Sequence, residues 1–87
     1  MKAQLKRYAK ERDEMLKKCD VNEFRKFVNA HKWFFSAEYL TAFNAASDEV
    51  LTITLHKMIV NVPKLPKELR DKSALWLIAH GYDLNVN

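Results

Sequence analysis

Apolar side chains recur at helical spacing through the first segment of the chain. Good helix formers fill the positions between them, and neither Gly nor Pro interrupts the segment. On a helical wheel, six residues share one arc of about 120°: Leu5, Tyr8, Ala9, Met15, Leu16 and Cys19. The pattern predicts an amphipathic helix over residues 1–19. Its apolar face resembles a coiled-coil seam, but over too few heptads for a coiled coil.

Polar residues suited to helix N-caps divide the next part of the chain. Asp20, with Glu23 three residues later, forms a capping box, and Ser36 and Ser47 each precede an apolar run. These caps predict three short helices, starting near residues 21, 37 and 48.

In residues 48–62, helix and strand compete as predictions. Residues 51–56 alternate between apolar and polar, as a strand does, and β-branched side chains are dense. The run nevertheless exceeds ten residues and contains no turn signal for a partner strand. We therefore prefer a helix and keep the strand as the alternative. Because this helix has apolar residues on two faces, we expect it at the centre of its bundle.

A fifth helix is expected after a break in the pattern at residues 61–65. Pro66 suits the first position of a helix, and Gly81 suits the left-handed residue that follows a helix end. Between them, residues 74–79 are apolar nearly all round, which predicts that the second half of this helix is buried.

Together these elements predict an all-α fold, a compact bundle of about five short helices with a basic N-terminal helix. A chain of 87 residues forms one domain: a basic amphipathic helix (1–19), a helical core (20–82) and a tail (83–87). One Gly and two Pro supply too little turn chemistry for a β domain, and 48% hydrophobic residues argue against disorder.

Cysteine content and hydropathy indicate where the protein resides. Cys19 is the single cysteine, whereas small secreted domains usually need several disulfides, so a cytoplasmic location is expected. No apolar run is long enough for a signal peptide or a membrane span, and we expect no membrane partner.

No residue pattern in the chain is typical of an enzyme. His31, His56 and His80 are far apart in sequence, and a single glycine cannot build a phosphate-binding loop. Cys19 becomes a nucleophile only if a base lies beside it in the fold. We therefore expect no catalytic site, no metal, no cofactor and no small-molecule substrate.

The net charge of +4 resides entirely in the first 18 residues, which hold seven basic and three acidic side chains. Lys2, Lys6 and Lys10 form an i, i+4 ladder near a helix N-terminus, where cations repel one another and oppose the macrodipole. Together with Arg7 they are candidates for phosphate contacts, which makes nucleic acid the alternative partner. The structural alternative is a solvated, fraying face.

Protein binding, by a partner or by self-association, is the preferred hypothesis. Three consecutive aromatic residues, Trp33–Phe35, connect two predicted helices and cannot all point inward. Exposed aromatic side chains are enriched at binding sites, although these residues also suit the gap between helices. The candidate partner-binding residues are Leu5, Tyr8, Arg12, Met15, Trp33 and Phe34.

Arg12 is unusual because it falls within the apolar arc of the first predicted helix. It suits three roles: snorkelling at the bundle edge, pairing with a buried acid, or lying in a seam that tolerates one charge. The sequence as a whole predicts a small, non-enzymatic regulatory module.

Overall fold

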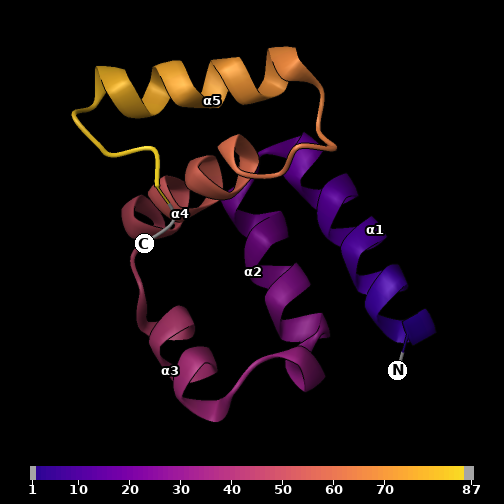
Figure 1. The fold of residues 1–87 in the computed structure, drawn as a ribbon. Helices are drawn as coiled ribbons and strands as arrows, with labels where there is room; N and C mark the ends of the chain where they lie inside the picture. Colours follow the sequence, from indigo (N-terminus) through magenta and orange to yellow (C-terminus); the bar gives the residue numbers. More distant parts are fainter. Residues whose placement is uncertain (1, 86–87) are drawn as a thin grey trace.

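The computed structural model describes residues 2–85, and these form an all-α fold, as predicted (Figure 1). Its helices are α1 (Lys2–Lys18), α2 (Val21–Ala30), α3 (Ala37–Ala45), α4 (Asp48–Val60) and α5 (Lys67–Ala79), with a short 3₁₀ helix, η1 (Lys32–Phe34), between α2 and α3. The segment in which helix and strand competed is helix α4. None of the described helices has the length and hydropathy needed to cross a bilayer.

Side chains cap three of these helices where the sequence predicts. The Asp20 carboxylate accepts hydrogen bonds from the backbone N–H groups of Asn22 and Glu23, at 2.7 and 3.1 Å. The hydroxyls of Ser36 and Ser47 each accept from the N–H three residues further on, at 3.1 and 3.2 Å. Because these bonds satisfy N–H groups that lack a partner within the helix, they fix where the short helices begin.

The end of α5 also matches its prediction. Gly81 has a φ of 77°, and the N–H of Tyr82 donates to the carbonyl of Leu77 at 2.9 Å, as in a Schellman motif. At the other end, Pro66 immediately precedes the first helical residue instead of occupying it.

The start of the tail is held against the bundle. The side-chain amide of Asn61, at the end of α4, donates to the carbonyl of Leu84 at 3.0 Å. The predicted tail ends in residues 86–87, which lie outside the described residues.

Helix α4 is central, as expected, because it packs against α1, α2 and α5. Its buried side chains Leu51, Leu55 and Ile59 meet apolar residues from the other helices. The remaining buried hydrophobic residues are Tyr8, Met15, Leu16, Phe24, Phe27, Val28, Phe43, Leu65 and Leu77. Helix α1 therefore packs on the bundle and does not project from it.

Helix α5 departs from its prediction. Its main neighbour is α4, so only one side of the helix is covered (Figure 1). Ser73 and Leu77 are buried on that side, whereas Leu75 and Ile78 are 67% and 61% exposed. The prediction that residues 74–79 are buried is therefore wrong for Leu75 and Ile78 and right for Leu77, because an all-round apolar segment does not reveal how many neighbours its helix has.

Candidate functional site

The apolar face of α1, which resembles a coiled-coil seam in the sequence, packs against the other helices of the same molecule. Tyr8 and Met15 are only 8% and 5% exposed and belong to the hydrophobic core. Because α1 packs its apolar face against α2 and α4, little of either side chain is accessible to a partner, and their role in partner binding stays a prediction.

Arg12 is paired with an acid, one of the three roles that its position suggests. Its Nη2 and Nε atoms lie 3.0 and 3.2 Å from Oδ1 of Asp13, and both side chains are partly buried. The pair holds the guanidinium against α1, and a contact between Arg12 and a partner stays a prediction.

Three other candidate residues remain on the surface. Leu5 in α1 is 45% exposed, and Trp33 and Phe34 in η1 are 47% and 46% exposed. We call the two exposed rings of Trp33 and Phe34 the aromatic surface. The carbonyl of His31, at the end of α2, accepts from the N–H of Phe34 at 2.9 Å, which closes the 3₁₀ turn.

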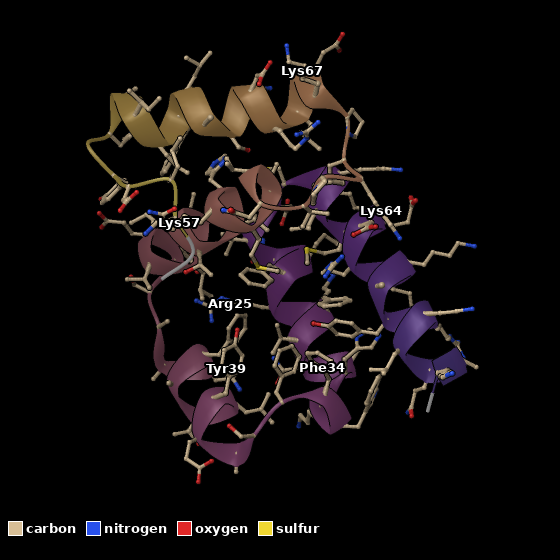
Figure 2. All side chains as sticks on the ribbon, in the orientation of Figure 1. Arg25, Phe34, Tyr39, Lys57, Lys64 and Lys67 are labelled. Carbon is tan, nitrogen blue, oxygen red and sulfur yellow. The ribbon has the colours of Figure 1, made fainter. Side chains whose placement is uncertain are left out.

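Ring contacts hold the exposed aromatic side chains in place. Phe34 stacks on the buried ring of Tyr8, with centroids 4.1 Å apart and an interplanar angle of 16° (Figure 2 labels Phe34). Trp33 meets the rings of Tyr8 and Phe34 edge-on, with ring centroids 6.0 and 5.8 Å away. Phe35 instead stacks on Tyr39 at 4.8 Å and packs against the core. The connector therefore both fills the gap between helices and presents two rings to solvent.

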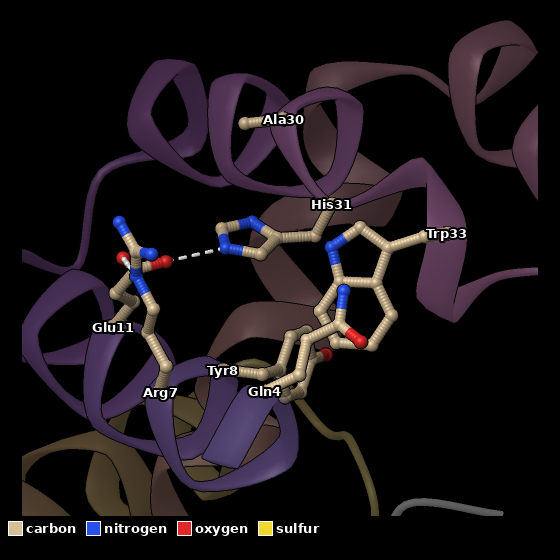
Figure 3. A pocket seen from close by; sticks show the side chains of 7 residues that line it. All are labelled: Gln4, Arg7, Tyr8, Glu11, Ala30, His31 and Trp33. Carbon is tan, nitrogen blue, oxygen red and sulfur yellow. Dashed lines mark hydrogen bonds and ion pairs between the residues drawn. The ribbon is translucent and has the colours of Figure 1, made fainter. Parts of the chain in front are cut away.

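Beside the aromatic surface lies a recess of about 300 Å³ (Figure 3). Gln4, Tyr8 and Trp33 gather in one part of it, and Glu11 and His31 form a hydrogen-bonded pair in another. The residues lining the recess are Gln4, Arg7, Tyr8, Glu11, Ala30, His31 and Trp33.

The Glu11–His31 pair ties α1 to the end of α2. Nε2 of His31 lies 2.5 Å from the Glu11 carboxylate, and Nδ1 lies 2.7 Å from the carbonyl of Phe27. Each ring nitrogen of His31 therefore has an acceptor within hydrogen-bonding distance. The hydrogen bond from His31 holds the pKa of Glu11 below its ordinary value, with a smaller contribution from Arg7. Sequence reasoning missed this pair, because its members are 20 residues apart.

The basic candidates on α1 differ in their ion pairing. Lys2, Lys6 and Lys10 are exposed and form no ion pair within residues 2–85. Arg7, in contrast, pairs with Glu11 at 3.2 Å and lines the recess.

Lys6 and Lys10 face a groove of about 420 Å³ between α1 and the segment that precedes α5. Lys17 and Lys64 line the same groove, so four lysines from two segments converge there. Asp13 and Glu14 also line it, but each is already paired with a neighbouring cation.

A base does lie beside Cys19 in the fold. The Sγ atom is 3.9 Å from Nδ1 of His56, and that nitrogen is 2.9 Å from the hydroxyl of Ser73. Burial raises the pKa of the Cys19 thiol and lowers the pKa of His56, so both groups are held uncharged near neutral pH. Ser73 is itself buried. The raised pKa of the Cys19 thiol disfavours the thiolate form that nucleophilic chemistry needs.

Within the described part of the chain, no three His, Cys, Asp or Glu side chains lie close enough to hold a metal ion. Comparisons of the sequence and the fold with protein-family models, curated proteins and solved structures find no match.

Proposed function

We propose that this protein is a non-enzymatic protein-interaction module that binds another polypeptide, or a second copy of itself, through the aromatic surface. The observation that supports this most strongly is that Trp33 and Phe34 are nearly half exposed and yet held by the buried ring of Tyr8, on which Phe34 stacks and which Trp33 meets edge-on. When a partner covers large apolar rings, it removes them from water, and this favours binding by about 25 cal/mol per Å² of apolar surface buried.

Rigidity adds to the case for binding. An aromatic side chain that is already ordered loses little conformational entropy when a partner covers it. The neighbouring recess offers a partner both concave surface and the charged Glu11 and Arg7 side chains, which suits a polar rim around an apolar centre.

The test compares three forms of the purified chain as bait. Trp33→Ser with Phe34→Ser removes both rings, and Val50→Ser is the matched control, because Val50 is an equally exposed apolar residue in α4. Proteins retained by the wild type are identified, purified and titrated against each form, with self-association measured by light scattering. We expect the double variant to bind at least tenfold more weakly, a loss of about 1.4 kcal/mol, and the control to bind normally. Equal affinity of all three forms would overturn the proposal.

Nucleic-acid binding is the second candidate function. It is supported by Lys6, Lys10 and Lys64, which form no ion pair within the described residues and line one groove. Replacing Lys6 and Lys10 by Gln should reduce the slope of duplex affinity against salt concentration by the amount expected for the loss of about two phosphate contacts. Lys57→Gln, in α4, is the control. An unchanged slope would dispose of this candidate.

A further inference from the structure

A further cavity, of about 450 Å³, lies where the last turn of α1 meets α4 and α5, and we call it the lysine-rimmed cavity. Side chains from three separate parts of the chain line it: Lys17, Lys18, Cys19, His56, Leu69, Lys72, Ser73, Leu75 and Trp76. None of these residues belongs to the aromatic surface or to its recess.

The only fully charged groups lining this cavity are cationic. Three of the nine lining residues are lysines and none is acidic. Lys17 and Lys18 pair with Glu14 and Glu23, acids that do not line the cavity, at 3.2 and 3.7 Å. Their position in the last turn of α1 is also explained by the helix dipole.

Neither an ion pair nor the helix dipole accounts for Lys72. It belongs to α5 and forms no ion pair within residues 2–85. Its positive charge is felt inside the cavity, where it lowers the pKa of the Cys19 thiol and so partly opposes the effect of burial. An unpaired cation beside a partly enclosed space attracts a negatively charged group.

The remaining lining is uncharged and largely apolar. Leu69, Leu75 and Trp76 supply the apolar part, and the ring of Trp76 stacks on His56 with centroids 4.3 Å apart. His56 is in turn bonded to Ser73, so this side of the cavity is already ordered. Such a lining accommodates an apolar body and leaves one end for a polar group.

We propose that this cavity binds a small organic anion, with its acidic head beside Lys72 and its apolar body against Leu75 and Trp76. A ligand of roughly ten to twenty non-hydrogen atoms suits a cavity of this size. The sequence predicts no small-molecule ligand, because the lining residues come from segments far apart in the chain.

The probe that tests this is 8-anilinonaphthalene-1-sulfonate, with uncharged N-phenyl-1-naphthylamine as its analogue. A Trp33→Phe background leaves Trp76 as the single tryptophan, so energy transfer from Trp76 reports binding near the cavity. We expect saturable sulfonate binding that is tighter than binding of the analogue. Lys72→Gln should weaken sulfonate binding about three- to tenfold and leave binding of the analogue unchanged.

A pair of variants on one helix supplies the control. Leu75→Glu and Ile78→Glu each add one negative charge to an exposed position of α5, but only position 75 lines the cavity. Leu75→Glu should abolish sulfonate binding, whereas Ile78→Glu should retain it. The proposal is overturned if the sulfonate does not saturate near Trp76, if Lys72→Gln has no effect, or if the two glutamate variants bind alike.

Discussion

Two histidines make different contacts in this molecule. His31 faces acceptors on both ring nitrogens and pairs with Glu11, whereas His56 is bonded to a serine hydroxyl and stacked on Trp76. The first contact lowers the pKa of Glu11, and burial lowers the pKa of His56. Glu11 and His56 therefore make the stability of the fold depend on pH in different ranges.

Glu11 makes the fold sensitive to acid. Its pKa lies below the ordinary value of 4.5, so in that range the unfolded chain binds more protons than the native one. The contribution is present above pH 4.5 and is lost as the pH falls through the lowered pKa. We expect Glu11→Gln to weaken the loss of stability below pH 4.5, measured by urea unfolding. Glu38→Gln, which removes a carboxylate without an ion pair in the described residues, should keep the wild-type acid dependence; equal slopes in all three proteins would contradict this role.

His56 acts closer to neutrality. Burial, with a smaller effect from His80, lowers its pKa from the ordinary value of 6.5. The unfolded chain then binds more protons just below pH 6.5, so this contribution to stability is present above that pH and declines as the pH falls. The difference in unfolding free energy between pH 7.5 and pH 5.5 should be smaller in His56→Gln than in the wild type. A larger or equal difference would show that His56 is not held neutral.

At the scale of elements, the sequence predicts well where the helices begin. Asp20, Ser36 and Ser47 cap helices where predicted, because capping involves only residues within one turn. The assignment of α4 as a helix succeeds for a related reason: its apolar face, spaced as in a helix, is the face that packs on the core. Helix positions and the core face of α4 were therefore predictable.

Features that depend on tertiary neighbours were not predictable. The seam of α1, with Tyr8 and Met15, reads equally well as a partner surface or as core, and only the packing of α1 decides between them. The Glu11–His31 pair and the lysine-rimmed cavity join residues from separate helices. No local sequence pattern predicts that residues from separate helices come together in this way.

Helix α5 offers a sharp test of its packing. Leu75 is exposed and Leu77 is fully buried, although both fall in one apolar run. We expect Leu75→Gln to change the unfolding free energy by no more than about 0.5 kcal/mol, and Leu77→Ala to reduce it by about 2–5 kcal/mol. Chemical denaturation of both variants measures this contrast. A large loss from Leu75→Gln would mean that the outer face of α5 is covered.

In the whole molecule, the two proposed binding surfaces lie at opposite ends of α1. Phe34 stacks on Tyr8 in the first half of α1, and Lys18 at the end of α1 lines the lysine-rimmed cavity, so the helix separates Tyr8 from Lys18 by about 15 Å at 1.5 Å per residue. We therefore expect variants at one surface to leave the other intact. This separation allows the protein partner and the organic anion to be tested independently.

The central claim is that a polypeptide covers the aromatic surface. Its most direct test is site-specific photocrosslinking in cells, with the photoreactive amino acid p-benzoylphenylalanine at position 34 and, as the control, at the equally exposed position 50. At position 34 the benzophenone retains an aromatic ring. We predict a discrete crosslinked product from position 34, of the mass of a dimer or of a complex with one other protein, and none from position 50. No product from position 34, or the same products from both positions, would contradict the claim.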